Sequence, residues 1–183
     1  KTLELSRVDE LTSLLNYRVL MEKLAEEVRR KIRTGREFAF VMIDIDDFKR
    51  VNDRYGHLEG SRLIAQMGPL LRMACRTDST DICFRYGGEE FSILLTETTM
   101  EEAQAVAERL RQAVDEYPFT VKVNHPQETI TISLGVSSMA GDKQKSITEL
   151  INEADIALYH AKAAGKNRVI CYCEGCGMPA ASN

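Results

Sequence analysis

The feature that most constrains the fold is the unbroken apolar run Phe-Ala-Phe-Val-Met-Ile at residues 38–43. The run has the length of a β-strand, and successive side chains of a strand point to opposite faces of the sheet. A strand that is apolar at every position therefore needs cover on both faces, as central strands in helix-covered sheets have. Asp44 follows directly, so the sequence predicts a buried central strand with a carboxylate at its end.

Composition indicates a single globular domain. The chain has 183 residues, of which 44% are hydrophobic and 28% charged, enough to bury a core and unlike a disordered or fibrous chain. Acidic residues outnumber basic ones by 28 to 24, so we expect no DNA binding through the phosphate backbone. No apolar run is long enough to cross a membrane. Five cysteines, an odd number, indicate a reduced cytoplasmic protein without a disulfide framework.

Further segments with the pattern of helices or strands follow. Apolar residues at helical spacing predict a helix at 16–33, and Gly56 and Gly60 break the next helical stretch. Two strand-like runs meet at Gly87-Gly88, which suits a tight hairpin because glycine adopts positive φ. The remaining predicted elements are helices at 46–55 and 60–75, strands at 82–86 and 90–95, a helix that opens at Thr99, a strand at 129–136 with one buried face, a helix from Ser146 to about Ala164, and a last strand at 168–172.

This βαββαβ order predicts an α+β domain of the ferredoxin-like or palm-like kind, with an antiparallel central sheet flanked by helices. Residues 1–15 are polar with leucines near helical spacing, and we expect a linker helix from an upstream region there. The domain itself is expected at residues 16–172, followed by a C-terminal tail at 173–183.

Carboxylates gather at two points that this fold would bring together. Asp44, Asp46 and Asp47 end the first strand, and Glu89 and Glu90 follow the glycine pair. If the hairpin pairs beside that strand, Asp44 and Glu89 meet at one sheet edge, where a hard cation such as Mg²⁺ would relieve their repulsion. Acidic residues at strand ends are also common as solvated caps, and for Asp46 and Asp47 both interpretations stay open.

The glycine pair and two lysines are compatible with a phosphate ligand at the same edge. Gly87 and Gly88 suit a plain hairpin turn, and they also let the backbone approach a triphosphate without an intervening Cβ. Lys162 and Lys166 are four residues apart near the end of the last predicted helix. A helix C-terminus favours cations in any protein, so the residues alone leave the structural and the phosphate-binding interpretations open.

The segment Arg85-Tyr-Gly-Gly-Glu-Glu-Phe91 resembles the signature of the GGDEF family, the diguanylate cyclases. The resemblance covers about residues 9–171 and follows the order of the family's motifs. The other matching segments are Asp9–Asn16 (DELTSLLN), Asp44–Asp53 (DIDDFKRVND), Tyr55–His57 (YGH), Ser133–Val136 (SLGV) and Ala154–Asn167 (ADIALYHAKAAGKN).

The resemblance implies a nucleotidyl transfer in a bacterial second-messenger enzyme, regulated by an upstream sensory or receiver domain. Each protomer of an antiparallel homodimer would bind one nucleoside triphosphate, and each 3′-hydroxyl would attack the other α-phosphorus with loss of pyrophosphate. Asp44, Glu89 and the Ile45 carbonyl would hold two Mg²⁺ (or Mn²⁺) ions, and Glu90 would lie near the metal or the hydroxyl. The residues implied for substrate binding are Phe48, Lys49, Gly87, Gly88, Lys162 and Lys166, the last in place of a more common arginine.

One departure from the family concerns the base of the nucleotide. The family reads guanine with an asparagine, here Asn52, and with an aspartate where this chain has Ser61. A carboxylate only accepts hydrogen bonds, which suits the N–H groups of guanine, whereas a hydroxyl donates and accepts and can also meet adenine. The change resembles hybrid promiscuous members that use GTP and ATP and make cyclic GMP-AMP beside cyclic di-GMP. We therefore expect a hybrid enzyme.

Three alternatives stay open. Ser61 can be a neutral variant in a strictly GTP-specific diguanylate cyclase, with guanine chosen by Asn52 and by the shape of the pocket. The chain can also be a non-catalytic GGDEF module that senses nucleotides, although such domains usually lose the glycine–glutamate turn or the metal aspartate, and here both are in place. A mononucleotide cyclase shares the palm-like architecture but not these motifs.

Two further departures lie away from the active site. Many family members have Arg-x-x-Asp before the glycine pair, where the product binds and inhibits. This chain has Asp78-Ser-Thr-Asp81 there, so we expect weak or absent product inhibition. Cys171, Cys173 and Cys176 are one ligand short of a zinc or iron–sulfur site, and we expect a frayed tail.

Overall fold

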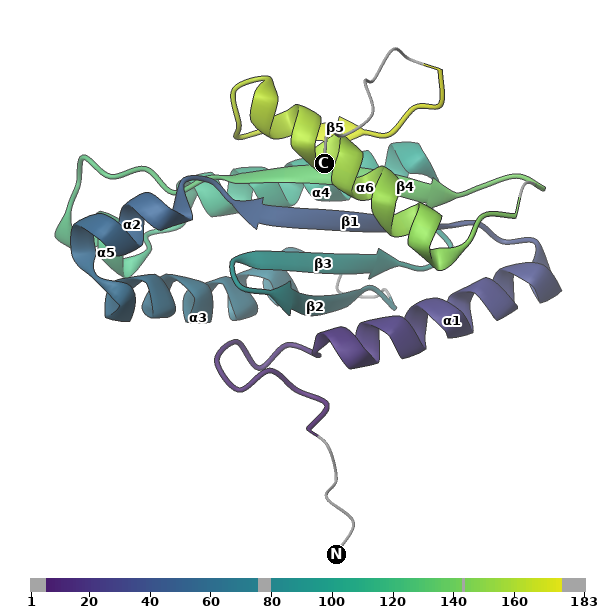
Figure 1. The fold of residues 1–183 in the computed structure, drawn as a ribbon, viewed down its shortest axis with the longest axis horizontal. Coiled ribbons are helices and arrows are strands. Elements are labelled where there is room, and N and C mark those ends of the chain that lie inside the picture. Colours follow the sequence, from purple (N-terminus) through teal and green to yellow (C-terminus); the bar gives the residue numbers. More distant parts are fainter. Residues whose placement is uncertain (1–5, 76–79, 143, 176–183) are drawn as a thin grey trace, which may run out of the picture.

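The computed structural model describes residues 6–75, 80–142 and 144–175. Its centre is a five-stranded sheet with helices on both faces (Figure 1). The strands are β1 (Phe38–Ile45), β2 (Ile82–Gly87), β3 (Glu90–Leu95), β4 (Ile132–Met139) and β5 (Val169–Cys171). The helices are α1 (Tyr17–Thr34), α2 (Phe48–Tyr55), α3 (His57–Ala74), α4 (Met100–Glu116), α5 (Thr120–Asn124) and α6 (Ile147–Ala163).

The order of the strands across the sheet is β2-β3-β1-β4-β5, so β1 is central, as its apolar run predicts. β1 pairs antiparallel with β3 and β4, and β2 pairs antiparallel with β3. This confirms the α+β class. β5, however, pairs parallel to β4, so the sheet is mixed and the prediction of an antiparallel sheet is wrong at this edge. The parallel pairing arises because α6 carries the chain back along the sheet before β5 begins.

Two helical layers cover the sheet (Figure 1). α1 and α6 pack on the face to which Phe40 and Met42 of β1 point, and α3 and α4 pack on the face to which Val41 and Ile43 point. All four side chains are fully buried, which confirms the predicted cover on both faces. β4 is buried at every position because α4 and α6 lie against it, so the prediction of one buried face is wrong.

Local sequence signals set several helix ends. α4 and α6 begin at the predicted residues with capping boxes, in which Thr99 and Glu102, and likewise Ser146 and Glu149, exchange side-chain to backbone hydrogen bonds. α3 begins before Gly60, so this glycine lies within the first turn and does not break the helix as predicted. α5 has no counterpart in the prediction, because five residues are too short to show a helical period.

Residues 6–15 form a turn and not the predicted linker helix. Val8 and Leu15 pair in an antiparallel bridge that closes the turn. The Asp9 carboxylate accepts hydrogen bonds from the N–H and the hydroxyl of Thr12, at 2.9 and 2.8 Å. An aspartate that satisfies nearby backbone in this way competes with helix formation. The division of the chain at residues 15 and 172 stays a prediction.

β4 and α6 approach each other backbone to backbone at Gly135. A Cβ at this position would lie 2.1 Å from the Ala154 carbonyl oxygen and 2.4 Å from the Leu158 nitrogen. A side chain of any size would therefore force the helix away from the strand. The contact sets the place of α6 over the sheet, and with it the place of the residues that follow on the helix.

The cysteines differ in state. Cys75, Cys83 and Cys171 carry thiols, whereas Cys173 is disulfide-bonded. The prediction of a fully reduced chain is therefore wrong at Cys173, and Cys176 lies outside the described residues. Across the described ranges, no helix is both long and apolar enough for a membrane span.

Candidate active site

The end of β1 and the β2–β3 turn form one edge of the sheet. The register of β1 with β3 places Asp44 opposite Glu90. The backbone N–H of Ile45 donates to the Glu89 carbonyl oxygen at 3.3 Å, which ties the turn to the end of the strand. The fold therefore brings all four of these sequence-predicted residues to the same edge.

Lys162 of α6 reaches this edge from the covering helix. Its Nζ lies 2.7 Å from Asp44 Oδ1 and 3.5 Å from Asp46 Oδ1. The side chains of Lys162 and Asp44 are 30% and 15% exposed, so the pair is mostly shielded from water and is stronger than an ion pair at an open surface. Lys162 thus holds a cation at this sheet edge, beside two carboxylates.

Three carboxyl groups around this edge have pKa values above their ordinary range. Burial raises the pKa of Asp44, and the hydrogen bond from Lys162 opposes this rise. Burial also raises the pKa of Glu90, and the charges of Asp44 and Asp155 add to the effect. The pKa of Asp155, on α6, is raised by burial as well. Negative charge is therefore concentrated here, and a cation would stabilise the ionised forms.

The oxygen atoms at this edge fit a hard divalent cation. The Asp44 and Glu89 carboxylates repel each other, since the charge of Glu89 helps to raise the Asp44 pKa, and the Ile45 carbonyl would add a third oxygen. Mg²⁺ usually takes one or two protein carboxylates and completes its shell with water and phosphate oxygens. The described residues hold no cluster of three His, Cys, Asp or Glu side chains that forms a metal cage, so the fit is to an open site of this kind.

Asp46 is a buried, hydrogen-bonded carboxylate beside the site and is not a solvated cap. It is buried and accepts hydrogen bonds from the hydroxyls of Thr131 and Ser133, both at 2.7 Å. The backbone N–H of Asn167 donates to it as well, at 3.0 Å. Asp46 therefore joins the end of β1 to β4 and to the loop before β5.

Two further cations lie near the start of α2. Lys166 Nζ is 2.6 Å from Asp47 Oδ1, and this hydrogen-bonded ion pair lowers the pKa of Asp47 and raises that of Lys166. Asp47 is exposed, in keeping with a strand-end residue in water, and Lys49 is exposed too. Both lysines are accessible to a charged ligand, and Lys166 would exchange its carboxylate partner for one.

Asn52 and Ser61 lie on adjoining helices. Asn52, on α2, packs against Gly60 of α3, where a Cβ would lie 1.8 Å from Asn52 Oδ1 and 3.1 Å from the ring of Phe48. Gly60 is buried, whereas Ser61 beside it is exposed. The fold therefore gathers Asn52, Phe48 and Ser61 at the junction of α2 and α3, with the serine at the solvent side.

Arg85 holds the glycine turn, a role that the sequence did not indicate. Its Nη2 donates to the Gly88 carbonyl oxygen and its Nη1 to Asp9 Oδ2, both at 2.9 Å. Gly88 has φ 51°, the left-handed region that glycine favours. Asp9 and Arg85 are 76 residues apart, too far for any periodic signal to reveal the pair. The turn that carries Glu89 is thus fastened to the N-terminal turn.

Asp155 also went without a predicted role. It lies seven residues before Lys162. This spacing of two helical turns places both residues on one face of α6, and it is the sequence signal that could have assigned Asp155 to the site of Lys162. Its charge helps to raise the pKa of Tyr86 to about 12, after burial and the neighbouring Tyr17. The rings of Tyr17 and Tyr86 meet edge to face with centroids 5.1 Å apart.

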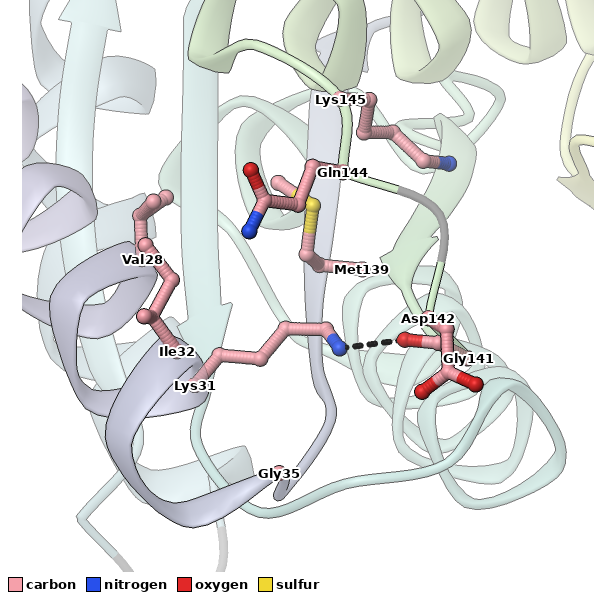
Figure 2. A pocket seen from close by; sticks show the side chains of 9 residues that line it. All are labelled: Val28, Lys31, Ile32, Gly35, Met139, Gly141, Asp142, Gln144 and Lys145. Atoms are coloured by element: carbon pink, nitrogen blue, oxygen red, sulfur yellow. Dashed lines mark hydrogen bonds between the residues drawn. The ribbon is translucent and has the colours of Figure 1, made fainter.

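A pocket of about 290 Å³ lies away from these residues (Figure 2). Gly35, before β1, and Met139, at the end of β4, line it. Beside it, Lys31 Nζ donates to the Gly141 carbonyl oxygen at 2.6 Å. Asp44 is near the opposite end of β1, so this pocket is separate from the candidate active site.

Two predictions fall at least partly outside the described residues. The segment expected to weaken product inhibition includes Asp78, and residues 76–79 are outside. The frayed tail includes Cys176, which is outside as well. Both stay predictions.

The fold and the site define a palm-like α+β domain in which carboxylates, a glycine hairpin and a helix-borne lysine meet at one sheet edge. This chain belongs to the GGDEF family: the family model described as "Diguanylate cyclase, GGDEF domain" matches residues 6–168.

Individual relatives agree with this assignment. The chain is 38% identical over 169 residues to the response regulator PleD of Caulobacter vibrioides, and 39% identical over 161 residues to the diguanylate cyclase DgcP of Pseudomonas aeruginosa. These matches cover 92% and 88% of this chain but 37% and 23% of the relatives, so it spans well under half of their length. The solved active GGEEF domain of a diguanylate cyclase from Vibrio cholerae is 34% identical, with a TM-score of 0.78, over 87% of this chain and 98% of that one.

Proposed function

We propose that this domain is a nucleotidyl cyclase that condenses two GTP molecules into cyclic di-GMP and releases two pyrophosphates. The observation that carries the proposal is the gathering of Asp44, Glu89 and Glu90 opposite Lys162, whose Nζ lies 2.7 Å from Asp44 Oδ1. The names of DgcP and of the Vibrio cholerae domain, both diguanylate cyclases, support GTP as substrate and cyclic di-GMP as product.

The residues at this sheet edge have two roles: some bind the triphosphate and others hold the metal ion. Lys162, Lys49 and Lys166 bind the triphosphate, and Gly87 and Gly88, which have open space where a Cβ would be, let it approach the backbone. Asp44, Glu89 and the Ile45 carbonyl would hold Mg²⁺ or Mn²⁺, which when bound polarises the phosphate and lowers the pKa of an attacking hydroxyl.

Glu90 is the group proposed to take the proton of the attacking 3′-hydroxyl. Burial raises its pKa, which makes its carboxylate a stronger base than an exposed one. Asp44, opposite it across the β1–β3 pair, is engaged by Lys162. The hydrogen bond from Lys162 opposes the rise of the Asp44 pKa, while the charges of Asp44 and Asp155 add to the rise of the Glu90 pKa.

A second copy of the domain completes the reaction. The described part of one chain offers a single arrangement of this kind, whereas the product joins two nucleotides through two equivalent bonds. An antiparallel homodimer would present two such edges to each other, so each 3′-hydroxyl attacks the α-phosphorus held by the partner. Because the chain spans only part of its relatives, an upstream regulatory domain belongs to this proposal too. Its signal would enter through the turn at residues 6–15, which Arg85 joins to Gly88.

A second candidate activity is the use of ATP beside GTP, with cyclic GMP-AMP as an additional product. The observation that favours it is the exposed Ser61 hydroxyl next to the contact of Gly60 with Asn52. A hydroxyl accepts from guanine and donates to adenine, so the loss of a carboxylate at this position weakens the discrimination between the bases. The names of the relatives favour the strictly GTP-specific cyclase.

The experiment is product analysis by mass spectrometry with Mg²⁺ and GTP alone, ATP alone, or both at equal concentration. Cyclic di-GMP from GTP supports the main proposal. Cyclic GMP-AMP in the mixture supports ATP use, and Ser61→Asp is then expected to restore cyclic di-GMP as the main product. Nucleotide binding without pyrophosphate release would instead indicate a sensing module, and a mononucleotide product would refute the dinucleotide chemistry.

A further inference from the structure

Glu128 is a buried carboxylate that contacts α2 at three points. It lies between α5 and β4, with a side chain that is 2% exposed. Arg50 Nη2 is 2.5 Å from Glu128 Oε1, Arg54 Nη1 is 3.5 Å from Oε2, and the Tyr55 hydroxyl donates to Oε2 at 2.8 Å. All three partners belong to α2. One carboxylate therefore contacts three residues of this helix.

The segment that carries Glu128 holds α2 in further ways. The rings of Tyr55 and His125 stack with centroids 4.1 Å apart and planes 20° apart. The Glu128 N–H donates to the His125 carbonyl oxygen at 2.9 Å, which joins this stack to the carboxylate. The Thr131 carbonyl oxygen accepts from the Asp46 N–H at 2.9 Å, just before α2 begins. The segment thus contacts the helix along its length.

Asn52 lies across α2 from the two arginines that contact Glu128. Successive residues of a helix advance by about 100°, so Asn52 is about 160° from Arg50 and from Arg54, and about 60° from Tyr55. On that side Gly60 leaves no clearance, since a Cβ on it would lie 1.8 Å from Asn52 Oδ1. A small rotation of α2 would therefore move the Asn52 amide out of this contact.

We infer that Glu128 is a positioning residue for recognition of the nucleotide base, because it sets the orientation of α2 and thereby the position of Asn52. The Glu128 carboxylate is buried while its two arginine partners are about half exposed, and separating a buried charge from its partners is unfavourable. The inference rests on the proposed function, in which Asn52 contacts the base of GTP.

The first variant is Glu128→Gln, which keeps the shape of the side chain and removes its charge. We expect the KM for GTP to rise about tenfold, because a misplaced binding group binds weakly. The Kd of 3′-deoxy-GTP, which lacks the attacking hydroxyl, is expected to rise by the same factor. The expected kcat stays within about twofold, since the sheet-edge carboxylates and Lys162 are unchanged.

Glu97→Gln is the matched control. Glu97 also pairs with two arginines, Arg30 and Arg36, but α2 is not among its partners. Its replacement is expected to change KM and Kd by less than about twofold, as surface pairs contribute little. Tyr55→Phe removes one hydrogen bond from Glu128 and keeps an aromatic ring against His125. It is expected to raise KM about threefold, less than Glu128→Gln, because the two arginine ion pairs still hold the carboxylate after one hydrogen bond is lost.

A double-mutant cycle with Asn52→Ala separates positioning from general damage. If Glu128 acts through Asn52, Glu128→Gln changes KM by less than about twofold once Asn52 is alanine. An equal increase in both backgrounds overturns the inference, and so does a loss of kcat at unchanged KM.

Failure of the proposed function gives a different result. A wild-type domain that releases no pyrophosphate from GTP refutes the cyclase proposal, while the Kd of 3′-deoxy-GTP still reports the effect of Glu128→Gln. An active wild-type domain whose Kd does not respond to Glu128→Gln refutes the inference alone. Absence of any 3′-deoxy-GTP binding to the wild type overturns both.

Discussion

Lys162 Nζ lies 2.7 Å from Asp44 Oδ1, across the sheet edge at which β1, β3 and α6 meet. The two residues are 118 positions apart in the chain. Their pairing keeps an ionised Asp44 at a place where burial disfavours it. In the proposed function the same lysine binds the triphosphate, so one side chain would serve the empty site and the loaded one.

Replacing Lys162 by methionine is expected to lower kcat/KM for GTP by about 10²–10³, the range for loss of one preorganised group that stabilises charge. Pyrophosphate release at saturating Mg²⁺ measures the effect. Lys145→Met is the control, because Lys145 forms a similar ion pair with Glu153, at 2.6 Å, near the other end of α6. A loss of equal size in both variants would mean that Lys162 acts only through the stability of the helix.

The raised pKa of Glu90 gives a defined dependence of stability on pH. Because the folded protein holds this proton more tightly than the unfolded chain, the contribution to stability is present below the ordinary Glu value of 4.5 and is lost as pH rises through the raised pKa. Glu90→Gln is therefore expected to gain stability relative to wild type above pH 4.5, by less than about 1 kcal/mol because solvent screens a half-exposed group.

Urea unfolding between about pH 4 and pH 8 without metal ions tests this pH dependence. Glu108→Gln is the control of opposite sign, because hydrogen bonding to Arg111 lowers the Glu108 pKa and its contribution is lost as pH falls. A Glu90→Gln variant that tracks wild type at every pH would contradict the prediction.

Substitutions of the adjacent residues Asp46 and Asp47 are expected to have very different effects on the free energy of unfolding. Asp46→Asn removes the charge of a buried carboxylate that accepts three hydrogen bonds, and we expect a loss of about 2–4 kcal/mol in the free energy of unfolding. Asp47→Asn breaks an exposed ion pair with Lys166 and is expected to change it by less than about 0.5 kcal/mol. Urea denaturation of the two variants side by side measures the difference, and equal losses would disprove the buried role of Asp46.

Binding of Mg²⁺ with 3′-deoxy-GTP is expected to raise the melting temperature by about 5–10 °C at a hundredfold excess over Kd. Asp44→Asn is expected to lose most of this shift, because it removes one of the two carboxylates. Chelation of the metal with EDTA gives the same loss in the wild-type protein, and Glu97→Gln keeps the full shift. A shift that survives EDTA would mean that nucleotide binding needs no metal, and a shift lost with EDTA but kept in Asp44→Asn would place the metal elsewhere.

The parts of the fold that were predictable are those with local signals. The apolar run of β1 and the capping boxes at Thr99 and Ser146 are each readable within a few residues. The prediction for β4 was wrong because Ser133 alternates with apolar residues as if it faced water. Its hydroxyl is buried and donates instead to Asp46, at 2.7 Å.

The candidate site also has residues that the sequence predicts and residues that it does not. Asp44, Glu89 and Lys162 sit in recognisable motifs, and the fold places them together. The supports of the site, among them the Arg85 contact with Asp9 and the Glu128 contacts with α2, join residues far apart in the chain. Single positions of this kind have no periodicity, so their partners appear only once the chain is folded.

The close approach of the β4 and α6 backbones at Gly135 also affects the dynamics of the domain. Because the Ala154 carbonyl and the Leu158 amide lie against the strand backbone, α6 cannot open locally without separating from β4. Amide hydrogens along Ile132–Met139 and the middle of α6 should therefore exchange with solvent together, in the slowest class of the molecule. The backbone that carries Lys162, just beyond this segment, would then be rigid. In the proposed function, Lys162 would exchange Asp44 for a phosphate by rotation about the bonds of its four methylene groups, on the nanosecond scale.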